Sequence, residues 1–137
     1  MSERELFSSP NVIPVGLVNI RSAQFQSILA DTAFAIMPSA SDACPGSVVQ
    51  AASCGLVPVL SRYCGVGWPE AIYAESLTVE EVRNRMQECL AMSTEAIQER
   101  SLAVQRRMEQ ECSRVAFHRR WEEILDEIVG PADTIRS

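Results

Sequence analysis

The chain of 137 residues contains no lysine, a single histidine and no cysteine pair with the spacing Cys-x-x-Cys. The absence of lysine excludes a Schiff-base lysine and the lysine of a phosphate-binding P-loop. The five cysteines are widely spaced and His118 is the one imidazole, so the sequence gives little support for a zinc site. We expect reduced, mostly buried thiols.

The sequence also lacks an excess of basic charge and a long apolar run. Its 12 basic residues, all arginine, are outnumbered by 18 acidic ones, and the net charge is −6. Nonspecific nucleic-acid binding requires a basic face, so we expect no nucleic-acid partner. No apolar run is long enough to cross a membrane, and the first ten residues, MSERELFSSP, do not have the pattern of a signal peptide. We therefore expect a cytoplasmic protein with no membrane span.

The length and composition suit one domain with its own core and are too small for a two-domain enzyme. Hydrophobic residues make up 47% of the chain and charged residues 22%, as in ordinary globular proteins. We divide the chain into a polar lead-in at residues 1–10, a domain at residues 11–129 and a tail at residues 130–137.

Apolar segments with turn residues between them predict an alternation of strands and helices. Strands are expected at residues 11–18 (NVIPVGLV), 33–37 (AFAIM) and 57–60 (VPVL), and helices at 21–31 and 45–54. Because successive strands joined by helices usually run parallel, the pattern predicts an α/β fold. We expect a Rossmann-like, open parallel sheet of about three to four strands flanked by helices.

The C-terminal third of the sequence is expected to be helical. Thr78 and Glu81 form a capping box, in which each side chain satisfies a backbone N–H group. Gly130, followed by a proline, is expected to end the last helix. Apolar residues recur at helical spacing in three amphipathic segments, whose apolar faces contain Val82, Met86, Cys89 and Leu90, then Ile97, Val104 and Met108, and finally Phe117, Trp121, Ile124, Leu125 and Ile128.

The chemistry-bearing residues lie in the loop after the predicted strand at residues 33–37. This is the position in which open α/β sheets bind ligands, because free N–H groups of a first helical turn attract anions. Gly46 has no side chain to obstruct a phosphate, and Ser47 adds a hydroxyl donor. Asp42 and Gln50 can accept hydrogen bonds from sugar hydroxyls. The alternative interpretation makes Asp42 a turn residue that binds its own backbone, and Gln50 an ordinary surface residue.

The stretch resembles the donor-binding motif of retaining glycosyltransferases of the two-Rossmann-domain (GT-B) architecture, especially family four. That motif has Pro-Ser, an acid three residues later, a second acid after seven further residues, a small-residue run and a Pro-Val strand. This chain has Pro38 and Ser39, then Asp42, Gln50 and Pro58 at the corresponding places. Similar segments surround the motif, so the resemblance covers most of residues 11–129; they are residues 11–16, 26–37, 67–72 and 113–125.

The resemblance implies a nucleotide-sugar donor, bound without a metal or other cofactor. It implies that Asp42 faces the sugar and that Gln50 faces the ribose. Pro45, Gly46 and Ser47 would lie against the two phosphates. The resemblance supplies no catalytic residue, and we assign none.

The chain departs from the family in ways that bear on activity. Asp42 and Gln50 both stand where the family has Glu, and an amide cannot accept from both hydroxyls of a diol, at a cost of about 1–3 kcal/mol. The acceptor domain and the earlier βα units are missing, and no arginine matches the family's phosphate clamp. Glu70 matches a family position near the donor and is a further candidate.

These observations leave three functions open. The first is the donor-binding part of a truncated glycosyltransferase, inactive alone, which transfers a hexosyl group only with a missing acceptor domain. The second is a catalytically inactive module of the same fold for binding or interaction, and the third is an unrelated small α/β domain. Because missing strands leave parallel edges exposed, we expect a homo-oligomer or a companion chain that carries the missing half.

Three further residues have both a structural and a functional interpretation. Cys44 adjoins the anion site as a loop residue or a reactive thiol. Trp68 packs against the domain or stacks on a ligand, and His118 is a surface residue or a base. We favour the structural interpretation for each.

Overall fold

The computed structural model describes residues 8–130, which belong to two compact units, Met1–Asp31 and Thr32–Ser137. The first unit contains helix α2 (Ala23–Ala30), as predicted, and the Ser22 hydroxyl caps it by accepting from the Phe25 N–H at 3.2 Å. The strand predicted at residues 11–18 is wrong, because this segment forms no strand. Pro14 has no N–H to give to a ladder, and Gly16 turns the backbone with φ of +69°.

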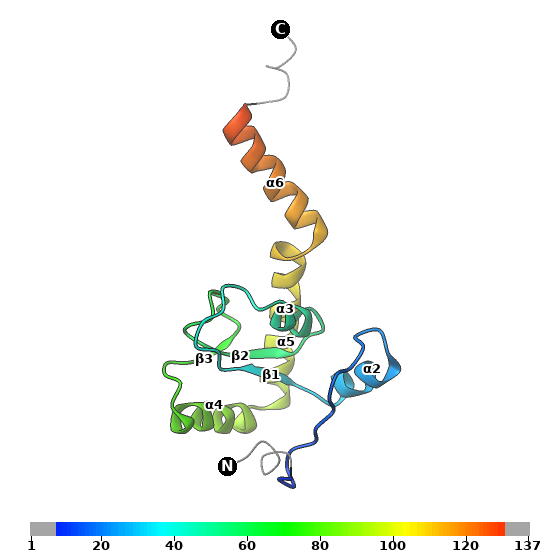
Figure 1. The fold of residues 1–137 in the computed structure, drawn as a ribbon, viewed down its shortest axis with the longest axis vertical. Coiled ribbons are helices and arrows are strands. Elements are labelled where there is room, and N and C mark those ends of the chain that lie inside the picture. The colour runs from blue at the N-terminus through cyan, green and yellow to red at the C-terminus, as the bar shows by residue number, and fades with distance from the viewer. Residues whose placement is uncertain (1–7, 131–137) are drawn as a thin grey trace. The chain divides into compact units, whose positions relative to one another are not determined.

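The second unit is built on a three-stranded parallel sheet in the order β1-β2-β3 (Figure 1). Strands β1 (Phe34–Met37) and β2 (Val57–Ser61) are those predicted, and β3 (Ile72–Ala74) was not predicted. All five residues of β2 are buried, as expected for the central strand of a parallel sheet. The α/β fold with an open, Rossmann-like parallel sheet is thereby confirmed.

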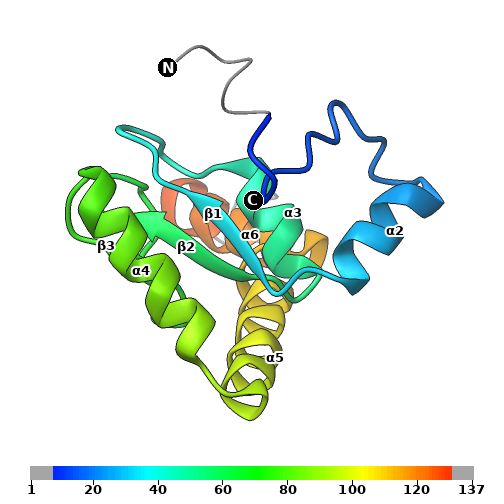
Figure 2. The same cartoon turned by 90° about the horizontal axis from the view of Figure 1, so that it is seen from below.

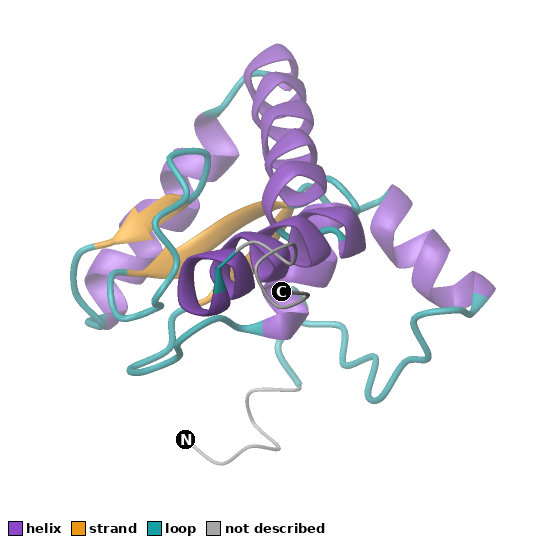
Figure 3. Ribbon diagram, turned by 90° about the horizontal axis from the view of Figure 1, so that it is seen from above, coloured by secondary structure: helices purple, strands orange, loops and turns teal. Residues whose placement is uncertain are grey.

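Helices pack against both faces of this sheet (Figure 3). Helix α3 (Gly46–Ser53) lies on one face and α4 (Val79–Ala91) on the other, as Figures 1 and 2 show from two directions. Helix α5 (Thr94–Glu111) packs against α3 and β2. The main apolar core lies between α3, α5 and the sheet and comprises Val48, Ala52, Leu60, Cys64, Trp68, Ala71, Val104 and Met108.

The connection from β2 to β3, residues 62–71, contains no helix. Trp68 anchors it at 6% exposure within the apolar core, and Arg100 and Arg107 of a later helix bind Glu70. The structural interpretation of Trp68 is therefore confirmed. The connection also explains why β3 was missed, since a three-residue strand after an irregular segment has no recognisable sequence period.

Short polar side chains begin the helices of the C-terminal third. The Thr78 hydroxyl accepts from the Glu81 N–H at 3.2 Å, as the capping box predicts. The Glu81 carboxylate accepts instead from the N–H of Glu75, which lies before the cap. Ser93 caps α5 by accepting from the N–H of Ala96 at 3.2 Å.

Helix α6 (Arg114–Val129) differs from the others because most of its apolar face is uncovered. Ser113 caps its start, and Gly130, with φ of +80°, ends it as predicted. Ala116 is its one buried residue within the described part of the chain, and its main packing partner is α5. An amphipathic helix usually turns its apolar face to a core, but this one turns it to solvent.

The five cysteines are free thiols. Cys64 and Cys89 are buried, whereas Cys44, Cys54 and Cys112 are exposed. The expectation that the thiols are mostly buried is therefore wrong. The exposed cysteines lie in the loop before α3 and just after the C-terminal ends of α3 and α5, where the chain has left the core.

Candidate functional site

The first turn of α3 presents backbone N–H groups to solvent. Pro45 is the N-cap, with extended backbone, and its carbonyl accepts from Val48 and Val49 at 2.9 and 3.1 Å. A proline has no side-chain acceptor, and the described residues provide no acceptor for the N–H groups of Gly46 and Ser47. Helices α2, α4, α5 and α6 each begin with a Ser or Thr whose hydroxyl accepts from the first turn. The α3 N-terminus thus keeps free donors beside a partial positive charge.

Nothing within the fold requires a glycine at position 46. Its φ is not positive, and a Cβ built on it would meet no atom within 4 Å. Glycine at the start of a helix weakens it relative to alanine. Gly46 therefore leaves open space above the free amides and contributes nothing evident to packing.

Gln50 shares a face of α3 with Gly46, four residues earlier, and both are exposed. Residues four apart lie on one face of a helix, so Gln50 follows Gly46 one turn along α3. The opposite side of the helix is anchored by Val48, 3% exposed, and by the fully buried Ala52. The structure thus places Gly46 and Gln50 on one exposed face of α3, and their role in a donor site stays a prediction.

Asp42 is held by its backbone between the loops that follow β1 and β2. Its N–H donates to the Tyr63 carbonyl at 3.3 Å, and its carbonyl accepts from the Gly65 N–H at 2.6 Å. Below this bridge, the Ser61 hydroxyl donates to the Ser39 carbonyl. The Asp42 carboxylate forms no hydrogen bond with the described residues, so the turn interaction with its own backbone is not formed.

The short distance between the two loops depends on Gly65. A Cβ at this position would collide with the backbone of Ala43. The loop before α3 and the loop after β2 therefore lie side by side at the carboxyl edge of the sheet. This is the edge at which open α/β sheets bind ligands.

Glu70 is committed to a different set of contacts. Its carboxylate receives two hydrogen bonds from Arg107 of α5, at 2.5 and 2.9 Å, and its carbonyl accepts from Arg100 at 2.9 Å. The hydrogen bond from Arg107 lowers the pKa of Glu70, while partial burial opposes it. These contacts give Glu70 a structural role, and its place in a donor site stays a prediction.

A second group of polar side chains at the carboxyl edge was missed from the sequence. Arg62 follows β2, donates to Glu75 at 2.9 and 3.0 Å, and lies 4.4 Å from the ring centroid of Tyr73. The hydrogen bond from Arg62 lowers the pKa of Glu75, and burial raises the pKa of Tyr73. The signal available was Arg62 at a strand end, but its partners lie in and after the strand that was not predicted.

These side chains line a hollow of about 420 Å³ together with Trp68 and Arg85. Arg85 forms ion pairs with Glu81 at 3.3 Å and Glu88 at 2.7 Å. Since the arginines of this hollow already have carboxylate partners, it offers little free charge to a ligand.

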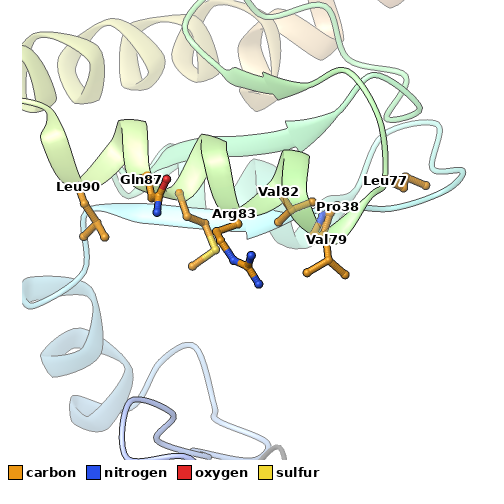
Figure 4. A pocket seen from close by; sticks show the side chains of 8 residues that line it. Pro38, Leu77, Val79, Val82, Arg83, Gln87 and Leu90 are labelled. Carbon is orange, nitrogen blue, oxygen red and sulfur yellow. The ribbon is translucent and has the colours of Figure 1, made fainter. Parts of the chain in front are cut away.

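A larger groove of about 590 Å³ lies along α4 and is mostly apolar (Figure 4). None of the predicted site residues lines it. Figure 4 shows Val79, Arg83 and Leu90 projecting to the same side of α4, and Leu90 is 84% exposed. Its lining comprises Pro38, Leu77, Val79, Val82, Arg83, Met86, Gln87 and Leu90.

The remaining candidates have simpler surroundings. Cys44 is exposed in the loop before α3, and His118 lies edge-on to Phe117 with ring centroids 5.9 Å apart. Within residues 8–130, no group of three or more His, Cys, Asp or Glu side chains is arranged to hold a metal ion. The described helices include none that is long and apolar enough to cross a membrane.

Comparison with known protein families, with curated proteins and with solved structures found no match to this chain.

Proposed function

We propose that the chain is a glycosyltransferase-like donor-binding domain that holds a nucleotide sugar at the N-terminus of α3. Gly46 and Ser47 donate their backbone N–H groups to the diphosphate, beside Pro45. Asp42 accepts from sugar hydroxyls, and Gln50 contacts the ribose. The nucleotide sugar is a substrate, and the proposal requires no metal ion.

The open first turn of α3 is the observation that carries this proposal. It combines two free amides, a glycine that packing does not require, and an adjacent carboxylate with no partner among the described residues. A diphosphate attached to a sugar has the charge and the hydroxyl groups that complement these features. Glu70, paired with Arg107, contributes little to this binding.

The same residues predict weak binding and no turnover by the chain alone. Replacing a carboxylate with the Gln50 amide removes a charge-assisted hydrogen bond worth about 1–3 kcal/mol, or roughly 10- to 100-fold in affinity. Hexosyl transfer would require an acceptor domain in addition to this one. The five free thiols suit a reducing compartment, and we place the protein in the cytoplasm on that basis.

Calorimetric titration of the full chain with UDP-, GDP- and ADP-sugars tests the proposal. We expect saturable binding to at least one donor, and loss of that binding in Gly46→Val, whose side chain covers the amides. Thr94→Val is the matched control, because Thr94 is also the first residue of its helix and is exposed. Flat titrations with every donor, for a chain that is folded by circular dichroism, would overturn the proposal.

The apolar groove on α4 favours a second function, that of an inactive interaction module. Val79 is 75% exposed and Ile36 of the edge strand β1 is 45% exposed. Exposed apolar patches and strand edges attract protein partners. Flat donor titrations together with an association that Val79→Glu abolishes would favour this function over donor binding.

A further inference from the structure

Helix α6 carries a largely uncovered stripe of large apolar residues. Phe117, Trp121, Ile124 and Ile128 follow one another at intervals of four, three and four residues. Phe117 is 64% exposed, Trp121 52% and Ile128 75%, whereas Ile124 is half-buried. This spacing is that of the a and d positions of a coiled coil, which places one seam along the helix.

The described part of the chain covers little of this stripe beyond Ile124. The buried residue of α6, Ala116, lies off the seam, and beyond the first turns the helix leads away from the sheet (Figure 1). Phe117 and Trp121 stack on each other with ring planes 7° apart and centroids separated by 6.5 Å. The two rings therefore form a continuous, preorganised apolar surface.

The charges of α6 are divided between its two halves. The first half carries Arg114, Arg119 and Arg120, and the second half carries Glu122, Glu123, Asp126 and Glu127. Two such helices side by side in the same direction would place like charges together. In opposite directions, the basic half of each helix faces the acidic half of the other.

We propose that α6 is a dimerisation helix that pairs in antiparallel fashion with α6 of a second copy of this chain. A twofold axis between Trp121 and Ile124 places Trp121 against Ile124 of the second copy. The same axis places Phe117 against Ile128 of the second copy, so one alignment pairs all four apolar residues of the seam. Such an interface is self-complementary and closes after two copies.

Two residues beside the seam give this alignment a specific test. In heptad terms Arg120 and Glu127 both occupy g positions, which face one another in an antiparallel pair. Each dimer therefore contains the pair Arg120 with Glu127 of the other copy twice. In the single chain Arg120 contacts Glu123 at 3.1 Å, with the two side chains 71% and 52% exposed, and an exposed pair of this kind is readily exchanged.

Sedimentation equilibrium of the full chain tests whether the seam is the interface. We expect a monomer–dimer equilibrium for the wild type, and weakening of the dimer by at least about tenfold in Trp121→Glu, because each copy would bury an unpaired charge. Val115→Glu is the control. Val115 is 77% exposed on the same helix but lies off the seam, so its substitution should leave the dimer constant unchanged.

Charge reversal tests the antiparallel direction. Arg120→Glu and Glu127→Arg should each weaken self-association at least about tenfold, because both place like charges opposite each other twice. An equimolar mixture of the two variants should form a heterodimer. The neighbouring, outward-facing positions give the controls Arg119→Glu and Asp126→Arg, which should change self-association little.

Several outcomes would overturn the proposal. A wild type that is monomeric throughout the accessible concentration range means that something else covers α6. A dimer that survives Trp121→Glu has its interface elsewhere, and a failure of the charge-reversed mixture to associate excludes the antiparallel pair. The proposal rests on α6 alone and does not depend on nucleotide-sugar binding.

Discussion

The carbonyl of Asp42 and the N–H of Gly65 are joined by a hydrogen bond of 2.6 Å, which connects the loop before α3 to the loop after β2. The bond holds Asp42, a candidate ligand-binding residue, against the segment that follows the central strand β2. It also makes the position of Asp42 sensitive to a residue that no ligand needs to contact.

Gly65→Ala should destabilise the protein by about 1–3 kcal/mol, because the new Cβ collides with the Ala43 backbone and forces the loops apart. Urea denaturation followed by tryptophan fluorescence measures this change. Gly67→Ala is the control in the same loop, since a Cβ there meets nothing within 4 Å. Equal stability of the two variants would show that the loops are not closely packed in solution.

Gln50→Glu should raise the affinity for a nucleotide sugar roughly 10- to 100-fold, because a carboxylate accepts from both ribose hydroxyls. Calorimetry with the donor that binds the wild type gives this ratio. Gln50 is exposed, so the folding stability should change little. Gln98→Glu on α5, also exposed, controls for net charge, and a similar gain in that variant would exclude a specific ribose contact.

Glu70→Gln should make the free energy of unfolding depend less steeply on pH in the acid range. The pKa of Glu70 is lowered in the folded chain, chiefly by the hydrogen bond from Arg107. A lowered pKa means that the carboxylate stabilises the fold fully above its unfolded pKa of about 4.3. That stabilisation is lost as the pH falls from there through the folded pKa.

Urea denaturation at intervals of roughly half a pH unit between about pH 3 and pH 7 therefore tests the contact between Glu70 and Arg107. The wild type should lose stability more steeply below about pH 4.3 than Glu70→Gln does. Glu109→Gln, at an exposed position on α5, should retain the wild-type slope. Parallel profiles for wild type and Glu70→Gln would show that the Arg107 contact does not persist in solution.

Ser113→Ala should fray the start of α6, because its hydroxyl accepts from the Ala116 N–H at 3.1 Å. Loss of such a cap costs about 0.5–2 kcal/mol. Since α6 has little packing to support it, the far-ultraviolet circular dichroism signal should fall. Ser113→Asp retains an acceptor and should keep the signal, and a loss in both variants would assign another role to Ser113.

Sequence patterns were sufficient for the elements with strong local signals. The continuous apolar runs gave β1 and β2, and Thr78 and Gly130 marked helix ends, with Gly130 adopting a φ of +80° after α6. The segment at residues 11–18 has strand-like composition, but Pro14 and Gly16 prevent a ladder. β3 is too short to show a period, so its identity depends on pairing with β2.

Part of the candidate site could also be predicted, because it depends on local helical spacing. Gly46 and Gln50 lie together because helical spacing places them on one face. The Asp42 bridge to Gly65 and the commitment of Glu70 to Arg107 join segments distant in sequence, which no local pattern encodes. The exposure of the α6 stripe could not be predicted from the sequence either, because periodicity identifies an apolar face but not what covers it.

Arg100 and Arg107 lie two turns apart on α5 and both donate to Glu70. Arg100 donates to the Glu70 carbonyl, and Arg107 donates to the Glu70 carboxylate. The loop that carries Trp68 is therefore tethered to a single helix at two points. Any fluctuation that unwinds this part of α5 releases the loop and lets water reach the indole ring. Amide exchange in the loop should consequently follow the opening rate of α5, so that the two segments behave as one cooperative unit.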